Sequence, residues 1–136
     1  MPVRAGAAGM TEETIKTDDA PAAAADYSQA TVIGDLAFTA GQVALTPEGE
    51  SLADEPVDVQ AEQVSENLAA VPSAAGADLG SALKTTVCFA DIDDYGTVDE
   101  VYGDHFDGDP PARSAVEVGT LPPGMAVEIE AVATRA

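Results

Sequence analysis

The spacing of apolar residues in this chain alternates between the period of a strand and the period of a helix. Two apolar, β-branched runs meet at Gly34 and Asp35, a pair suited to a two-residue turn, so residues 27–45 predict a hairpin. From Asp58 the apolar residues recur three and four positions apart, which marks one face of an amphipathic helix. That face consists of Ala61, Val64, Leu68, Val71 and Ala75. The chain therefore needs both a sheet and a helix that packs on it.

The ends of this first helix carry recognisable signals. Asp58 is a residue type that caps a helix start, and Gly76 is the type that closes a helix end. Pro72 conflicts with the pattern, because an interior proline lacks a backbone donor and costs roughly 3 kcal/mol. We expect either a kink in the last turn or an early end.

The second half repeats the alternation. Residues 81–92 predict a strand with Leu83, Thr85, Val87 and Phe89 on one face and Lys84, Thr86 and Cys88 on the other. A second helix is predicted from Asp93 or Asp94 to about Phe106, with Tyr95, Val98, Tyr102 and Phe106 on one face. Two strands follow, at 113–118 and 125–134. The order β-β-α-β-α-β-β predicts an α+β fold with two helices on one sheet.

One compact domain is expected from the length of 136 residues. Residues 1–25 show no sustained period of either kind and predict a mobile leader, which leaves 26–136 as the single domain.

Acidic residues outnumber basic ones by 25 to five, for a formal net charge of −20. Such self-repulsion is best tolerated where salt shortens the Debye length to about 3 Å, so we expect a salt-rich cytoplasm of the halophile type. The same charge repels phosphate backbones and anionic lipids, which argues against nucleic acid or membrane as partners. Cys88 is the single cysteine and cannot form an intrachain disulfide, and no secretory signal precedes the domain, which favours the cytosol.

Arg113 is a rare cation in this chain, and it follows two prolines with only Ala112 between. If the last two strands form an antiparallel hairpin, Arg113 lies opposite Glu130 and Ala115 opposite Glu128, on the face away from Val127. One interpretation is a solvated ion pair worth under about 1 kcal/mol. The other is a guanidinium that clamps the carboxylate of a small acid, with Glu128 and Glu130 as candidates for proton transfer.

Other residues give weaker signals. Asp91, Asp93 and Gly96 superficially resemble a calcium loop, but helix capping is the preferred interpretation. His105 has no second histidine or cysteine near it in the sequence and is expected at the surface or a helix end. Lys84 could reach a carboxylate or pair with the acidic surface, and Cys88 is expected to be a small buried side chain. The sequence contains no phosphate loop, nucleophile elbow or dinucleotide fingerprint, and we expect no metal and no cofactor.

Six segments in one order resemble the RidA/YjgF family of reactive-intermediate (enamine/imine) deaminases. They are DYSQA, GDLAFTAGQVALTPEGE, QAEQVSENLAAV with AAGADL, LKTTVCFADIDDYGTVDEVYGDHF, PPARSAVEV and LPPGMAVEIEAVA. Together they cover nearly everything from Lys16 to the C-terminus. Each segment is a modest match, and their combination is specific.

The resemblance implies a chorismate-mutase-like fold, assembled as a homotrimer with three clefts between subunits. In the family the arginine of the PARS motif binds the substrate carboxylate, which corresponds to Arg113. The glutamate of the EIEA motif is expected to position or activate water, which corresponds to Glu128. The resemblance also implies that Tyr27 lines the cleft and that Gly41 and Ala115 contact ligand through backbone groups.

Three positions depart from the best-studied branch of the family. Ala40 stands where that branch has serine, Asp99 where it has asparagine, and Ala115 where it has cysteine. The first two changes remove hydrogen-bond donors, and a carboxylate at 99 opposes a bound carboxylate unless it is shielded.

The leading hypothesis is hydrolysis of a 2-imino acid, the tautomer of a 2-aminoacrylate-type enamine, to a 2-keto acid and ammonia. The first alternative is a non-catalytic trimer that binds small carboxylates and acts as a sensor or regulatory partner. Endoribonuclease activity, historically attached to this family, ranks last because the net charge of −20 repels RNA.

Overall fold

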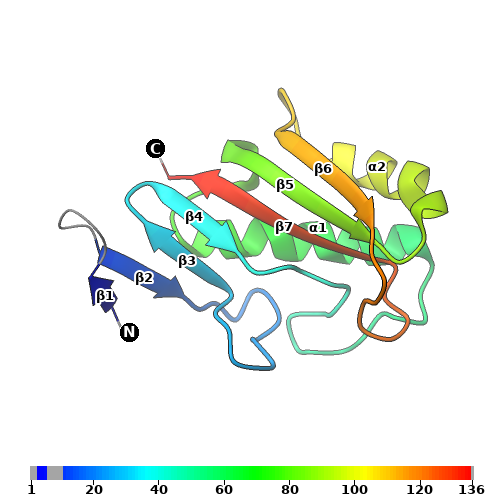
Figure 1. The fold of residues 1–136 in the computed structure, drawn as a ribbon, viewed down its shortest axis with the longest axis horizontal. Coiled ribbons are helices and arrows are strands. Elements are labelled where there is room, and N and C mark those ends of the chain that lie inside the picture. The colour runs from blue at the N-terminus through cyan, green and yellow to red at the C-terminus, as the bar shows by residue number, and fades with distance from the viewer. Residues whose placement is uncertain (1–2, 6–10, 136) are drawn as a thin grey trace.

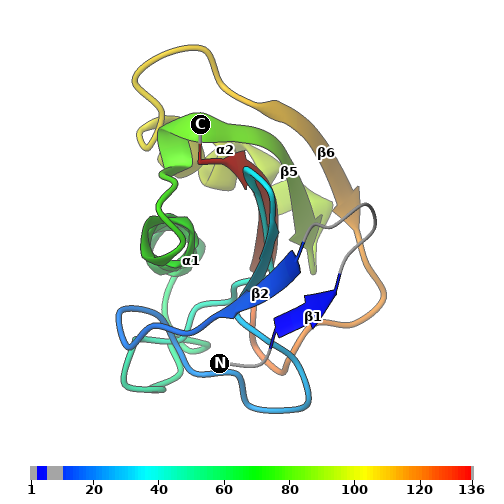
Figure 2. The ribbon, with the colours of Figure 1, turned by 90° about the vertical axis from the view of Figure 1, so that its left-hand side faces the viewer.

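The computed structural model describes residues 3–5 and 11–135 as a seven-stranded mixed sheet with helices on one face (Figures 1 and 2). The elements are β1 (Val3–Ala5), β2 (Thr11–Ile15), β3 (Ala30–Ile33), β4 (Leu36–Thr39), α1 (Val57–Ala74), β5 (Ala82–Phe89), α2 (Tyr95–Gly103), β6 (Ala112–Glu117) and β7 (Val127–Thr134). Short 3-10 turns, Leu79–Ser81 and Ile92–Asp94, precede β5 and α2. In space the strands run β1-β2-β3-β4-β7-β5-β6. The predicted class, α+β with two helices on one mixed sheet, is confirmed.

The predicted hairpin is present in β3 and β4. Ile33 pairs with Leu36, and Gly34 between them has a φ of 57°, the left-handed conformation that a tight hairpin turn needs. The leader prediction is wrong in part, because β2 pairs antiparallel with β3 and so extends the sheet. Ala20 and Pro21 are also buried. Residues 1–2 and 6–10, which belong to the same predicted leader, lie outside the described residues.

Helix α1 follows the predicted apolar stripe and closes at Gly76 as predicted, but its N-cap is not Asp58. Pro56 is the N-cap and Asp58 lies within the first turn, where its charge favours the positive end of the helix dipole. Pro72 lies in the last turn and the helix continues through Ala74. Gly76, at a φ of 84°, closes it as a Schellman motif, with bonds from Gly76 N to Ser73 O and from Ala77 N to Pro72 O.

Strand β5 has the predicted parity over most of its length. Thr85, Val87 and Phe89 are buried, but Leu83 is 52% exposed because the pairing with β7 shifts register between Ala82 and Lys84. Helix α2 ends at Gly103, before Phe106, because the next backbone bonds, such as Phe106 N to Gly103 O, are i to i−3.

The predicted hairpin of the last two strands is wrong. Strand β6 pairs in parallel with β5 at the edge of the sheet, and β7 lies on the other side of β5, between β5 and β4 (Figure 1). Helix α2 provides the crossover that parallel pairing of β5 and β6 requires. Strand β7 is the more buried of the two and therefore occupies a central position.

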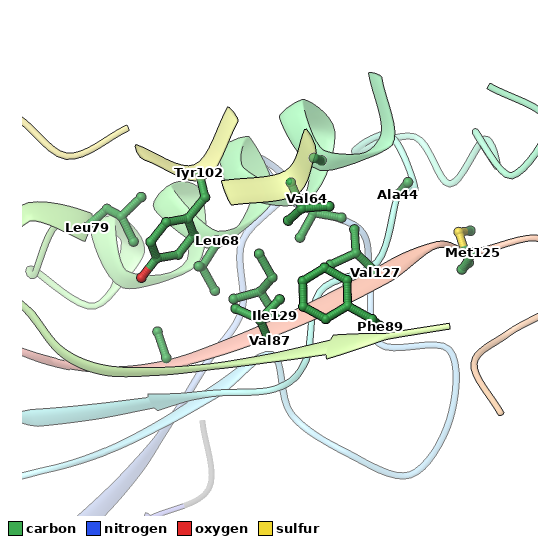
Figure 3. Packing of buried hydrophobic residues seen from close by; sticks show 13 residues of the cluster. Ala44, Val64, Leu68, Leu79, Val87, Phe89, Tyr102, Met125, Val127 and Ile129 are labelled. Carbon is green, nitrogen blue, oxygen red and sulfur yellow. The ribbon is translucent and has the colours of Figure 1, made fainter. Parts of the chain in front are cut away.

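The main core lies between the sheet and the two helices (Figure 3). It contains Val64 and Leu68 from α1, Phe89 from β5, Tyr102 from α2 and Ile129 from β7, all at 5% exposure or less. The opposite face of the sheet, which we call the outer face, carries no helix among the described residues (Figure 2). Of the helices described, none is long and apolar enough to cross a membrane.

Candidate active site in two halves

Arg113 projects from the edge strand β6 toward α2, on the helix-covered side of the sheet. It pairs with Thr85 of β5, which is fully buried on that side, and parallel neighbours in register point the same way. Its Nη1 donates to Asp99 Oδ1 at 2.7 Å, and its Nη2 donates to the Tyr95 hydroxyl. Arg113 is thus a partly buried cation, with a side chain 21% exposed, held by the first two turns of α2.

Two tyrosine rings hold the guanidinium in place. Its carbon lies 5.3 Å from the centre of the Tyr95 ring and 4.9 Å from that of Tyr102, within cation–π range. The Tyr102 hydroxyl shares a buried hydrogen bond of 2.7 Å with Thr85 Oγ1, which fixes that ring. Burial alone lowers the pKa of Arg113, but its hydrogen bond to Asp99 and the charge of Asp99 raise the pKa above its usual range. The group is therefore always charged.

Glu128 and Glu130 point to the outer face, away from Arg113. They alternate with Val127, Ile129 and Ala131 of β7, which are buried against the helices. Their partners on β5 are Cys88 and Thr86. The predicted pairs of Arg113 with Glu130 and Ala115 with Glu128 are wrong, because β5 intervenes and places Ala115 beside Val87 on the helix side.

Glu128 forms the second half of the site together with Gly41. Gln42 and Ile129 exchange backbone hydrogen bonds of 2.8 and 3.1 Å, which brings the chain at Gly41 against the Glu128 side chain. A Cβ on Gly41 would lie 2.7 Å from Glu128 Cδ, so only glycine leaves the carboxylate its present position. Burial, and then the charge of Glu130, raise the pKa of Glu128 above that of a free carboxyl group.

Tyr27 belongs to the same half. It is 53% exposed, and together with Gly41 it lines a small cavity of about 30 Å³. It also lines a hollow of about 390 Å³ bounded by residues of the N-terminal segment, including Lys16 and Thr17. Residues that the sequence assigned to the leader therefore border the candidate site.

The structure thus divides the predicted site residues into two groups. Tyr27, Gly41 and Glu128 form one half, and Arg113 with Ala115 forms the other on the opposite side of the sheet. Sequence reasoning missed Tyr95 and Tyr102 as partners of Arg113. Their spacing on one face of α2 is the available signal, but the spacing alone does not indicate that this face meets Arg113.

The weaker candidates have structural explanations. Asp91 accepts a hydrogen bond from Asp93 N, which confirms the capping interpretation. His105 Nε2 lies 3.1 Å from Glu62 Oε1, just beyond the end of α2. Lys84 Nζ donates to Ser114 Oγ at 3.0 Å. Cys88 is only partly buried, contrary to prediction, because it lies on the outer face, where burial and the charges of Glu128 and Glu130 raise the pKa of its thiol.

Known proteins with this sequence pattern and fold share one family. The family described as Endoribonuclease L-PSP matches residues 17–135. A rat protein named 2-iminobutanoate/2-iminopropanoate deaminase is 42% identical over 123 residues, which is 90% of each chain. Reactive Intermediate Deaminase A, chloroplastic, from Arabidopsis thaliana is 41% identical over 94% of this chain and 68% of its own length.

Solved structures agree with this match. The crystal structure of RidA from an Antarctic Psychrobacter has a TM-score of 0.85 at 41% identity, covering 90% of this chain and 98% of that one. Escherichia coli TdcF with bound serine has a TM-score of 0.84 at 37% identity, covering 91% of this chain and 99% of that one. The chain therefore belongs to the Endoribonuclease L-PSP family, which is the RidA/YjgF family.

Proposed function

We propose that this protein hydrolyses reactive 2-imino acids to 2-keto acids and ammonia. The observation that carries the proposal is Arg113, a permanently charged guanidinium held between two tyrosine rings at the edge of the sheet. A fixed guanidinium binds a carboxylate through two parallel hydrogen bonds. The rat and Arabidopsis relatives, named as deaminases, support the reaction class, and the TdcF structure with bound serine supports a small carboxylate as ligand.

In the proposed reaction Arg113 holds the substrate carboxylate and so fixes the position of the neighbouring imine carbon. Glu128 orients a water molecule and accepts its proton as the water oxygen bonds to that carbon. The electrons of the carbon–nitrogen double bond pass to the nitrogen, which takes the proton that Glu128 accepted. The second proton of the added water then passes through Glu128 to the same nitrogen as the carbon–oxygen double bond forms, so that the carbon–nitrogen bond breaks and ammonia leaves with the 2-keto acid. Burial, and then the charge of Glu130, raise the pKa of Glu128, which makes the carboxylate a better proton acceptor than a free carboxylate.

One chain cannot bring both groups to the same substrate, because Arg113 and Glu128 lie on opposite faces of the sheet. We therefore propose that Arg113 of one copy meets Glu128 of another in a homotrimer. The outer face supports such an assembly, since Phe38 and Val116 are 41% and 45% exposed there. In this proposal Glu128 can act on a substrate only when a second copy covers the outer face and supplies its Arg113.

The alternative of a non-catalytic carboxylate-binding trimer rests on Asp99. Its carboxylate already pairs with Arg113 at 2.7 Å, so an incoming carboxylate must share the guanidinium with it. This alternative keeps the role of Arg113 and needs no working Glu128.

Turnover separates the two functions. The protein is mixed in molar KCl with a serine or threonine dehydratase and its amino acid, and keto-acid release is followed. Acceleration over the dehydratase alone is expected, and Arg113→Ala and Glu128→Gln should each abolish it. Arg135→Ala is the matched control, since that guanidinium bonds the carbonyl oxygen of Gly34. No acceleration by the unaltered protein would refute the deaminase proposal, and full activity of Arg113→Ala would refute the clamp.

A further inference from the structure

The ion pair of Asp99 and Arg113 leaves binding capacity on both partners. Asp99 uses Oδ1 for Arg113, and its side chain is 50% exposed, with no hydrogen bond at Oδ2 among the described residues. Arg113 makes two hydrogen bonds in the described structure, one from each terminal nitrogen, out of five N–H groups. A ligand can therefore bind the cation and the anion at the same time.

The position of Asp99 on α2 keeps this anion close to the cation. Asp99 lies one turn after Tyr95, so the same helix face supplies both partners of the guanidinium. Glu100, the next residue, is also exposed, but it makes no hydrogen bond or ion pair with Arg113. The local charge at the clamp is thus dipolar, with one positive and one negative group 2.7 Å apart.

The substrate and the product of the proposed reaction differ in the charge that they carry next to the carboxylate. A protonated 2-imino acid, like an amino acid, carries a positive nitrogen two bonds from its carboxylate carbon, so its charges match a guanidinium beside a carboxylate. A 2-keto acid has the carboxylate alone, and Asp99 repels it. Unlike charges at this distance attract and like charges repel with comparable strength.

We propose that Asp99 determines specificity by charge type, favouring zwitterionic ligands over purely anionic ones at Arg113. This inference rests on the proposed role of Arg113 as the carboxylate site. Its consequence is that the keto-acid product is released more readily than the imino-acid substrate. Weak product inhibition follows from the same arrangement.

The test measures binding rather than turnover. Affinities for pyruvate, the anion, and for glycine, the zwitterion, are determined by titration calorimetry at low and at molar KCl. Asp99→Asn should bind pyruvate about fivefold more tightly than the unaltered protein, the size expected for a half-exposed pair, and should bind glycine more weakly. Glu100→Gln removes the same charge from the same helix and should change neither affinity. Molar salt should reduce the effect of Asp99→Asn.

The outcomes separate this inference from the proposed function. An unchanged ratio of the two affinities in Asp99→Asn, or an equal change in Glu100→Gln, would overturn the specificity role, whatever the turnover. Failure of the unaltered protein to bind either ligand would overturn it as well. Absence of turnover together with the expected change in ratio would overturn the deaminase proposal and leave the role of Asp99 intact.

Discussion

Replacing Gly41 by alanine tests the Glu128 half of the site with a single methyl group. The added Cβ would lie 2.7 Å from Glu128 Cδ and 2.9 Å from both its Cγ and Oε1. Carbon atoms in ordinary contact are about 3.5–4.0 Å apart, so the carboxyl group must retreat by about 1 Å. A misplacement of that size costs on the order of 100-fold in rate when it affects a reacting group. We expect kcat of Gly41→Ala to fall about 10- to 100-fold.

The same substitution should leave substrate binding nearly unchanged, because the added Cβ contacts Glu128, whereas Arg113 is held by Asp99 and Tyr95. KM in the dehydratase-coupled assay should therefore stay within about twofold. A rise in KM at constant kcat would mean the loss of contacts that are equally strong in the ground state and the transition state, and the substitution leaves the contact of Arg113 with the carboxylate in place. The stability cost should be at the low end of the about 1–3 kcal/mol typical of overpacking, because the end of the Glu128 side chain can move.

A matched glycine gives the control. Gly103 ends α2, and an added Cβ there meets nothing within 4 Å, so Gly103→Ala should keep both kcat and KM. The reasoning would be refuted if Gly41→Ala turned over at the unaltered rate, or if its loss of activity came from KM alone.

Three further predictions concern charge, backbone and buried polarity. Glu130→Gln removes the like charge that, after burial, raises the pKa of Glu128, so the acid limb of the activity profile should move to lower pH. Gly76→Ala should lower the free energy of unfolding by about 1 kcal/mol in urea denaturation, because φ is 84° and no close contact adds to the strain. Thr85→Val leaves the buried Tyr102 hydroxyl without its partner and should cost about 1–3 kcal/mol, whereas the double variant with Tyr102→Phe should cost less than the sum of the single changes.

Each of these three predictions has its own control or its own contradicting result. Glu117→Gln, on the same sheet, should leave the pH profile in place, and an equal shift in both variants would indicate a general field effect. Gly96→Ala is the backbone control, since an added Cβ there meets nothing and its φ is not positive. Additive costs for Thr85→Val and Tyr102→Phe would show that the two hydroxyls are not coupled.

Local patterns in the sequence were sufficient for most of the elements. The apolar stripe of α1, the Gly34–Asp35 turn and the burial of Val87 and Phe89 depend on contacts within a helix, a turn or one strand face. These properties follow from the periods of 3.6 and 2 and from the conformational freedom of glycine. The resemblance to a known family added the residue roles but could not place them relative to one another.

The N-terminal segment shows where local patterns were insufficient. Strand β2 is short, and its residues, such as Glu12 and Glu13, are polar, so no alternation of apolar residues marks it. It becomes a strand because β3 offers a free edge whose backbone groups it can pair with. A neighbour in space, rather than its own composition, decides its structure.

The sequence by itself determined that Glu128 and Glu130 share one face of their strand and that Arg113 and Ala115 share one face of theirs. Only the tertiary structure decided that these faces are opposite sides of the sheet. The reason is that parity within a strand is local, whereas the relation between two strands depends on which strand lies between them. Strand β5 lies between β6 and β7, which separates Arg113 from Glu128 and divides the candidate site into two halves.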